Sequence, residues 1–454
     1  MQNKDRSELA TAPIGKLLFK LAVPTVIAQL VNMLYNIVDR IYIGHMPENG
    51  SLALTGVGVC MPLIMIVSAF AALIVSGGAP RASISMGKGN SQEAEKILGN
   101  CFTAQIAISL LLTLAMLLFN RKLLLTFGAS ENTIDYAVDY MNVYAVGTIF
   151  VQLTLGMNAF ITAQGFTKTS MMTVLIGAVV NIVLDPIFIY VFDMGVKGAA
   201  LATVISQAIS CIWVVTFLCG KKTALHLKKA NLRIVPGLLF PCLALGLSAF
   251  IMQGSESLIS VCFNASLLRY GGDTAVGAMT ILTSVMQFAM LPMQGIAQGA
   301  QPISSYNFGA KRADRVKQTF KLLLKSCMIY STILWAVIQL APRAFAGIFT
   351  SDPVLLNYTA NAMHIYFAVL LLFGIQISTQ MTFVSIGNAV CSIIVAVVRK
   401  FVLLLPLIYI LPNLFENKTQ AVYMAEPIAD ALAITFTAIL FSVQFKKAMK
   451  DLEA

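Results

Sequence analysis

The chain has 454 residues, of which 58% are hydrophobic and only 11% are charged, and its mean hydropathy is +0.82. A typical soluble domain carries about 25% charged residues, so this composition excludes a water-soluble protein and indicates a membrane protein. The net charge of +11 does not indicate nucleic-acid binding, because the basic residues lie in short connectors between apolar segments. We therefore expect membrane lipid, and no nucleic acid, around this chain.

Apolar segments recur along the whole chain, and each reaches the roughly 20 residues needed to cross a bilayer core. Twelve spans are predicted, at 17–45, 53–78, 97–119, 133–163, 170–192, 196–219, 240–268, 275–304, 318–340, 355–385, 389–412 and 421–445. The predicted fold class is an all-α membrane protein with 12 transmembrane helices. The first sixteen residues lack the apolar core and cleavage site of a secretory signal, so we expect them to be retained.

The connectors carry the orientation signal. With the N-terminus placed inside, 22 Lys and Arg residues fall in the tails and inward connectors, and seven fall on the outward side. Because basic residues accumulate on the cytoplasmic side of membrane proteins, this asymmetry predicts a multi-pass protein of the cytoplasmic (inner) membrane. Both termini are expected to be cytoplasmic, and we expect a monomer.

The two halves of the chain are related by an internal duplication. Eight identities recur at a constant offset of 222 residues: Ala53 with Ala275, Gly77 with Gly299, Pro80 with Pro302, Gly87 with Gly309, Phe127 with Phe349, Tyr136 with Tyr358, Tyr144 with Tyr366, and Gly165 with Gly387. Six spans per unit predict two parallel repeats about an axis along the membrane normal. The predicted parts are an N-lobe, 1–219, a cytoplasmic linker, 220–236, and a C-lobe, 237–454.

Motifs for enzymatic chemistry are absent. The eight cysteines contain no CxxC and the three histidines are scattered, which argues against a disulfide framework or a zinc site. No GxxxxGK[ST], HExxH or GxSxG is present. We therefore predict a protein that is not an enzyme and has no cofactor.

Several acids lie where acids are rare. Asp39, Asp185, Glu256 and Asp430 fall inside predicted spans, and Glu426 falls near an outer end. A carboxylate at the bilayer centre costs roughly 2.5–3.5 kcal/mol, and such residues commonly mark ion or proton pathways. Each is a candidate functional residue.

Three spans of the first half bring polar groups to one depth. At 1.5 Å per residue, Asp39 lies about 33 Å and Asp185 about 22 Å from the inner surface, while Thr203 lies about 10 Å below the outer surface. Asn181 shares a helix face with Asp185. The alternatives are that Asp39 extends to the interface beside Arg40, and that Asp185 only caps a break at the following proline.

Further polar residues of the first span lie on the same face as Asp39. These supporting residues are Asn32, Tyr35 and Asn36. Pro24 predicts a kink, because proline removes a backbone hydrogen bond and leaves a carbonyl free inside the membrane.

At these residues the sequence resembles the multidrug and toxic compound extrusion (MATE) family over essentially its whole length. The resemblance rests on Pro24 with QLVNMLYNIVDRIYIG, on NIVLDPIFIYVFDMGVKGAALAT (181–203), and on QGAQPISSYNFGAKRADRV (298–316). It implies that Asp39, Asn181, Asp185 and Thr203 form a site in the N-lobe that binds a proton or a cation such as Na⁺. It also implies that Tyr35 and Asn158 support this site and that Pro24 is a hinge.

Departures from the family pattern favour its DinF/MepA-like branch. NorM-like members carry C-lobe acids in the seventh and tenth helices; Glu256 can stand for the first, but FAVLLLFG, after Tyr366, contains no acid. Asn264 stands where the second half would repeat Asp39. Arg399 has two equal interpretations. It either faces a cavity as the partner of an acid, or it extends its charge to the membrane interface.

The predicted function is secondary active efflux of organic, mainly cationic, drugs by antiport with H⁺ or Na⁺ as the coupling ion. The alternative is a lipid-linked oligosaccharide flippase of the same superfamily, against which the intramembrane acids argue. Soft apolar side chains suit varied flat molecules. The weakly predicted substrate contacts are Phe150, Met157, Met286 and Met290, for which core or lipid packing is the alternative.

Overall fold

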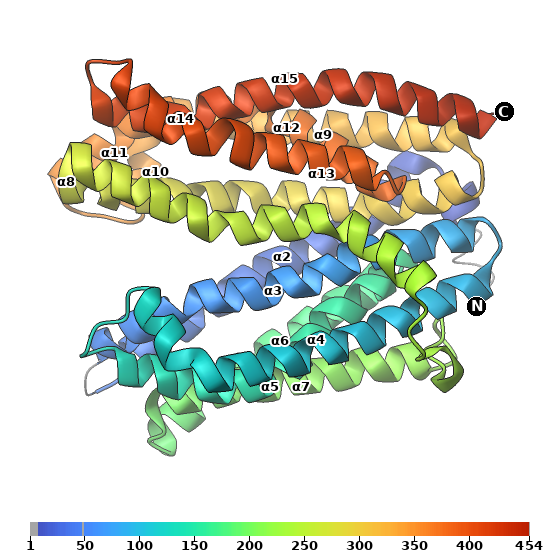
Figure 1. The fold of residues 1–454 in the computed structure, drawn as a ribbon, viewed down its shortest axis with the longest axis horizontal. Helices are drawn as coiled ribbons and strands as arrows, with labels where there is room; N and C mark the ends of the chain where they lie inside the picture. The colour runs from blue at the N-terminus through green and yellow to red at the C-terminus, as the bar shows by residue number, and fades with distance from the viewer. Residues whose placement is uncertain (1–7, 48–49, 454) are drawn as a thin grey trace.

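The computed structural model describes residues 8–47 and 50–453, and every regular element in that part of the chain is helical (Figure 1). The first half contains α2 (Ile14–Gly44), α3 (Gly50–Gly87), α4 (Ser91–Thr126), α5 (Ile134–Ala163), α6 (Thr167–Pro186), η1 (Ile187–Val191) and α7 (Gly195–Cys219). A linker with the short η2 (Lys229–Asn231) follows.

The second half begins with a 74-residue helix, α8 (Pro236–Gly309). The other elements are α9 (Ala313–Leu340), α10 (Pro342–Gly347), α11 (Pro353–Tyr366), η3 (Leu370–Leu372), α12 (Phe373–Ser385), α13 (Ala389–Val397), η4 (Val398–Leu404), α14 (Leu405–Ile410), η5 (Leu411–Asn413) and α15 (Lys418–Glu453).

The long helix α8 is two spans joined by a sharp reversal. Gly272 has φ 66° and ψ −163°, a conformation that glycine reaches far more readily than other residues. Figure 1 shows the chain running to one end of the molecule and returning beside itself. With α8 counted as two spans, and α11 with α12 as one bent span, the described helices provide the 12 predicted crossings.

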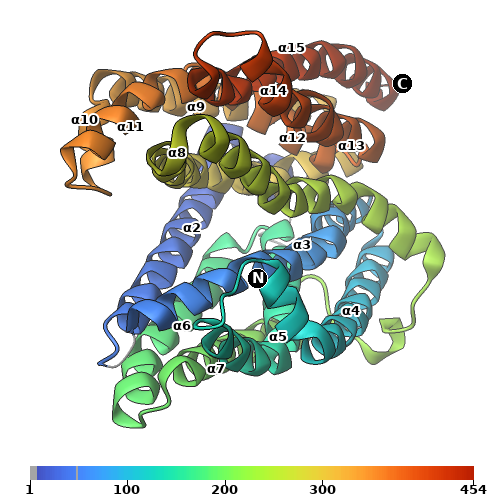
Figure 2. The same ribbon diagram turned by 60° about the vertical axis from the view of Figure 1, so that its left-hand side comes forward.

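The helices form two groups that lie one above the other in Figures 1 and 2, α2–α7 in one and α8–α15 in the other. Each group has a separate apolar core: one contains Tyr140 and Tyr144, and the other contains Phe263, Tyr366 and Tyr423. The linker docks on the first group, where the Gln164 side-chain oxygen accepts hydrogen bonds from residues 223–225.

At one end of the molecule the two groups meet through close backbone contacts between α3 and α8. A Cβ on Gly87 would lie 2.0 Å from the Tyr306 carbonyl oxygen, and a Cβ on Gly309 would lie 2.0 Å from the Ile84 carbonyl oxygen. Small residues allow helices to approach this closely inside a membrane. Gly87 and Gly309 are equivalent in the two repeats, so the contact is pseudo-symmetric.

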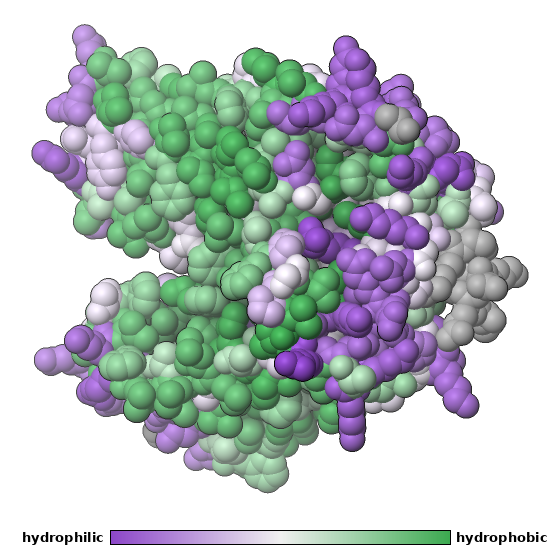
Figure 3. Space-filling view, turned by 45° about the vertical axis from the view of Figure 1, so that its right-hand side comes forward, coloured by the Kyte–Doolittle hydropathy of each residue, from purple (hydrophilic) through white to green (hydrophobic). Residues whose placement is uncertain are grey.

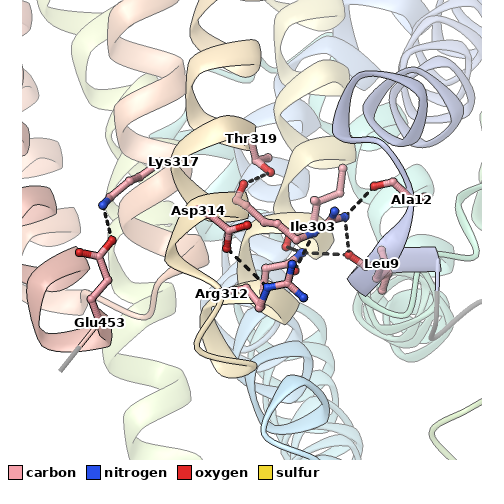
Figure 4. Close-up of polar contacts among 10 residues, drawn as sticks. Leu9, Ala12, Ile303, Arg312, Asp314, Lys317, Thr319 and Glu453 are labelled. Atoms are coloured by element: carbon pink, nitrogen blue, oxygen red, sulfur yellow. Dashed lines mark hydrogen bonds and ion pairs between the residues drawn. The ribbon is translucent and has the colours of Figure 1, made fainter.

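The segment before α2 reinforces the same end. The Arg315 guanidinium donates to the carbonyl oxygens of Leu9 and Ala12, at 3.0 and 2.8 Å, and to the side-chain oxygen of Asn307 at 3.0 Å (Figure 4). Asn307 in turn donates to the Leu9 carbonyl at 3.0 Å. Nearby, Lys317 pairs with Glu453 on α15.

The opposite end is open. Figure 3 shows a hollow between the two groups at the left, whereas they meet at the right, where hydrophilic residues gather. The molecule is therefore open to one side of the membrane and closed to the other.

Candidate ion-coupling site

The predicted site assembles from three helices of the first group. The carboxyl groups of Asp39 on α2 and Asp185 on α6 are direct neighbours, close enough to share a proton. Asp39 Oδ1 and Asp185 Oδ2 are both buried and lack a hydrogen-bond partner in the described part of the chain. The two acids, 146 positions apart in the sequence, therefore form one polar unit inside an apolar bundle.

Asn181 connects this unit to the third helix. Its side-chain nitrogen lies 3.2 Å from Asp185 Oδ1 and 3.5 Å from the Thr203 hydroxyl oxygen on α7. Its own oxygen, Oδ1, is buried without a partner. Asp39, Asn181, Asp185 and Thr203 thus lie together, and three of their oxygen atoms have unused hydrogen-bonding capacity.

The backbone at this place is irregular for a local reason. Pro186 has no backbone N–H, and α6 continues directly into the π-helical turn η1. Single π-helical turns inside α-helices are often found at functional sites. The break directly follows Asp185, so the site lies at the point where α6 departs from regular geometry.

Two carboxyl groups in contact cannot both be ionised without a compensating charge, because like charges at this separation repel strongly. In the described part of the chain, neither acid forms an ion pair within 4 Å with a basic side chain. A shared proton satisfies the pair, as does a hard monovalent cation held by carboxylate, amide and hydroxyl oxygens.

A cavity of about 330 Å³ adjoins the site. It is lined by Asn32 and Tyr35 of α2, Asn158 of α5 and Gly177 of α6, and Gln298 of α8 reaches it from the other group. The site residues lie about one turn beyond the lining residues along α2 and α7, and about one to two turns beyond them along α6. Tyr35 lines the cavity and is close to both acids, so it stands between cavity and site.

The other supporting residues are distributed around this cavity. Asn36 donates from its side chain to the Asn32 carbonyl at 2.6 Å and contacts Tyr35. Asn158 donates to the Ser170 carbonyl at 3.3 Å, and its oxygen is buried without a partner. Pro24 is buried within α2, beside Thr25, whose hydroxyl donates to the Gly295 carbonyl of α8 at 2.6 Å.

The remaining predicted residues lie elsewhere. Glu256 belongs to the second group, where the Lys400 ammonium donates to it at 2.7 Å. Met157 is fully buried in an apolar core that includes residues of α4. Met286 and Met290 pack against the core of the second group. With Phe150, these three lie outside the lining of the cavity, whose wall is mostly small and polar.

The sequence named the acids Glu256, Glu426 and Asp430 singly and left Arg399 as either the partner of an acid or a cation at the interface. The structure shows Arg399 as the partner of two of these acids. Arg399 Nε lies 2.7 Å from Asp430 Oδ1, and Arg399 Nη2 lies 3.6 Å from Glu426 Oε1. With Glu256 and Lys400 these residues form a charged cluster in the second group. One feature of the sequence could have predicted this cluster. Arg399 and Lys400 are adjacent bases in a span without an acid, so their partners had to come from other helices.

Two groups of membrane-spanning helices, open to one side and carrying paired acids in one group, define a membrane transporter. The model of the MatE family matches residues 24–187 and 248–410. The multidrug export protein MepA of Staphylococcus haemolyticus is 24% identical over 423 residues, covering 93% of this chain and 92% of that protein. MepA of Staphylococcus aureus (strain NCTC 8325) is 24% identical over 404 residues, covering 89% and 88%.

Solved structures agree. The MATE multidrug transporter DinF-BH in complex with R6G has a TM-score of 0.87 at 35% identity, covering 95% of this chain and 96% of that one. A MATE crystal structure in the bent conformation has a TM-score of 0.93 at 22% identity, covering 99% of both chains. The chain therefore belongs to the MATE family, in its DinF/MepA-like branch. It is a secondary transporter and not an enzyme.

Proposed function

We propose that this transporter exports organic, mainly cationic, small molecules across the cytoplasmic membrane by antiport with H⁺ or Na⁺. The observation that carries the proposal is the close approach of the Asp39 and Asp185 carboxyl groups, each with a buried oxygen that lacks a hydrogen-bond partner in the described residues. The names of the MepA relatives, multidrug export proteins, support the general class of function. The carboxyl pair supports the finer statement about coupling.

The mechanism follows from competition for one pair of charges. In the outward-open state, the pair takes a proton or Na⁺ and loses its free negative charge. An organic cation in the adjoining cavity then loses electrostatic attraction and leaves to the outside. The two lobes then rock relative to each other to the inward-open state, where the ion dissociates and a new substrate binds.

The membrane potential supplies useful energy to such a cycle. One charge moved through the potential corresponds to about 2.3 kcal/mol per 100 mV. Since 1.4 kcal/mol is a tenfold change in an equilibrium constant, one net inward charge sustains roughly a 40-fold gradient of substrate at 100 mV.

Pro24 is proposed as the hinge of α2 in this cycle. Proline leaves the carbonyl four residues earlier without its helical hydrogen bond, and Thr25 joins α2 to the Gly295 carbonyl of α8. Bending at this position would move Asn32, Tyr35 and Asp39 together, because all three lie on the same helix beyond the proline.

The wall of the cavity argues for organic cations over lipid-linked pyrophosphates. Its described lining contains no Lys or Arg side chain, while amide, hydroxyl and phenol groups are frequent. A pyrophosphate would need basic partners inside the membrane. The flippase alternative therefore receives no support from this cavity.

The orientation is also proposed. The basic tails and linker support a cytoplasmic position for the closed end and both termini, by the positive-inside rule. The hollow of Figure 3 then faces outward, and the described conformation corresponds to the outward-open state.

The experiment is efflux of a fluorescent cationic dye from vesicles under separately imposed H⁺ and Na⁺ gradients. The wild type is compared with Asp39→Asn and Asp185→Asn. Asp135→Asn serves as the matched control, because Asp135 is an exposed acid of the same lobe that pairs with Arg121. We expect one gradient to drive the wild type and the control, and neither site variant to respond. Normal efflux in both site variants would refute the proposal.

A further inference from the structure

A second cluster of buried charges lies in the C-lobe. It contains Arg399 and Lys400 on η4, Glu426 and Asp430 on α15, and Glu256 on α8. The side chains of Arg399 and Glu426 are each 8% exposed, those of Asp430 and Lys400 are 4% exposed, and that of Glu256 is 49% exposed. Burial of so many charges in a membrane bundle is costly, so the cluster requires an explanation beyond packing.

Its position repeats that of the N-lobe site. Glu426 lies eight residues after the first residue of α15, and Thr203 lies eight residues after the first residue of α7. Arg399 and Lys400 lie in the π-helical η4, and Asp185 immediately precedes the Pro186 break and the π-helical η1. Both repeats therefore place polar groups at the corresponding helices and beside the same kind of backbone irregularity, and in the C-lobe these groups are charged.

The charges of the cluster do not balance. Three carboxyl groups face two permanent or near-permanent cations, which leaves one negative charge in excess if all five groups are ionised. An uncompensated charge buried at this depth costs several kcal/mol. One proton on one carboxyl group makes the cluster neutral.

The geometry indicates which carboxyl group takes that proton. Asp430 accepts a hydrogen bond from Arg399 Nε at 2.7 Å, and Glu256 accepts one from Lys400 Nζ at 2.7 Å. The only ion-pair contact of Glu426 in the described residues is the 3.6 Å approach to Arg399 Nη2, which exceeds hydrogen-bonding distance. Glu426 is therefore the acid without a cation of its own.

The surroundings of Glu426 contain few other titratable groups. Tyr366 of α11 is the additional titratable neighbour, and the ring of Phe373 of α12 lies under Arg399, 4.9 Å from its guanidinium carbon. Glu256, half-exposed, is the most exposed member of the cluster. The next residue, Ser257, contacts Met65 of α3 at 4.0 Å, so this side of the cluster borders the other lobe.

We propose that the C-lobe cluster is a second proton-exchange site, in which Glu426 takes up and releases one proton in each transport cycle. The proposal rests on the antiport function proposed above. It adds one proton per cycle to the charge moved by the N-lobe pair. Arg399 and Lys400 donate hydrogen bonds to the other two acids, so the exchanged proton is assigned to Glu426.

The first measurement is infrared difference spectroscopy of the purified full chain between high and low pH, which detects protonated carboxyl groups inside the protein. Asp39→Asn with Asp185→Asn forms the background, since it removes the N-lobe signal. We expect a titrating carboxyl band in this background, its loss on adding Glu426→Gln, and its retention on adding Glu416→Gln, an exposed acid before α15.

A second variant covers the case in which Glu426→Gln fails to fold. Glu256→Gln removes one acid at another position and leaves two acids facing two cations, so the cluster is neutral without a proton. The band is expected to be lost here as well. A band that persists in the variants that fold, whether Glu426→Gln or Glu256→Gln, would overturn the proposal.

The second measurement is the number of protons exchanged per dye molecule in proteoliposomes. We expect Glu426→Gln to exchange one proton fewer than the wild type and Glu416→Gln to match the wild type. An equal count in the wild type and Glu426→Gln would refute the second site alone. Dye transport by the wild type that responds to neither an H⁺ nor a Na⁺ gradient would instead refute the antiport function.

Discussion

Gly87 and Gly309, equivalent residues of the two repeats, each pack against the backbone of the helix that carries the other. A methyl group on either would lie 2.0 Å from a carbonyl oxygen of the partner helix. The two halves of the duplicated chain are thus held together at one end by a symmetric contact that tolerates no side chain. In a transporter that works by rocking two lobes, this contact must form and break in every cycle.

Gly87→Ala and Gly309→Ala are expected to shift the transporter away from the described closed end. Overpacking of this kind typically costs about 1–3 kcal/mol, which changes the ratio of the two states about 5- to 150-fold. The measurement is the distance distribution between spin labels on the two lobes near this end. Gly58→Ala on the same helix is the control, because a Cβ there meets no atom within 4 Å. A wild-type distribution in both variants would contradict this role for the contact.

Arg315→Gln is expected to release the segment before α2. The change removes two hydrogen bonds from a buried guanidinium to the carbonyls of Leu9 and Ala12, and hydrogen bonds to charged groups contribute about 1.5–3 kcal/mol each. Faster proteolysis near the N-terminus and a lower melting temperature would report the release. Arg312→Gln is the control, since the Arg312 side chain is exposed and pairs with the neighbouring Asp314. Equal proteolysis of the two variants would show that Arg315 does not hold this segment.

Asn181→Leu is expected to weaken ion binding without removing either carboxyl group. Its amide contacts both Asp185 and Thr203, and leaving a buried polar group unpaired costs about 1–3 kcal/mol. The affinity for the coupling ion should therefore fall roughly 5- to 150-fold. The concentration of H⁺ or Na⁺ at half-maximal transport measures this, and Thr203→Ser, which keeps the hydroxyl, should change it little. An unchanged half-maximal concentration in Asn181→Leu would exclude the amide from the site.

Glu95→Gln is expected to loosen the linker between the lobes. Glu95 is largely buried and accepts a hydrogen bond from Lys228 at 2.6 Å, and His226 Nδ1 lies 3.3 Å away. Loss of its charge removes the ion pair with the Lys228 ammonium, so trypsin should cut the basic linker sooner than in the wild type. Glu131→Gln, at an exposed position of another connector, should leave the cutting rate unchanged. Equal rates in both variants would show that Glu95 does not hold the linker.

Most of the fold follows from the sequence, because a bilayer permits few solutions. Apolar runs of span length, together with the 222-residue offset, predicted the 12 helices and the reversal between the seventh and eighth. The N-lobe constellation was predictable too, since Asn181 and Asp185 share a helix face and Asp39 and Thr203 lie at a similar depth. Periodicity and depth specify which residues meet along and between adjacent helices.

The other contacts depended on the direction in which each side chain points, which the depth of a residue in the membrane does not determine. The sequence placed Glu256 inside a span, but its partner Lys400 became evident only from the packing of α8 against η4. Met157 has the composition of a flexible drug contact, but the rotation of α5 turns it into the core. Helix rotation about its own axis is set by packing against neighbours, which a single sequence does not reveal.

The central claim is that substrate and coupling ion compete for the Asp39–Asp185 pair. The most direct measurement is calorimetric titration of the purified transporter with a cationic dye, in buffers of different ionisation enthalpy and with or without Na⁺, which counts the ions released on binding. We predict that dye binding releases H⁺ or Na⁺, that binding tightens as the concentration of the released ion falls, and that Asp39→Asn and Asp185→Asn abolish the release. Dye binding with no release of either ion, or an unchanged release in both variants, would contradict the account.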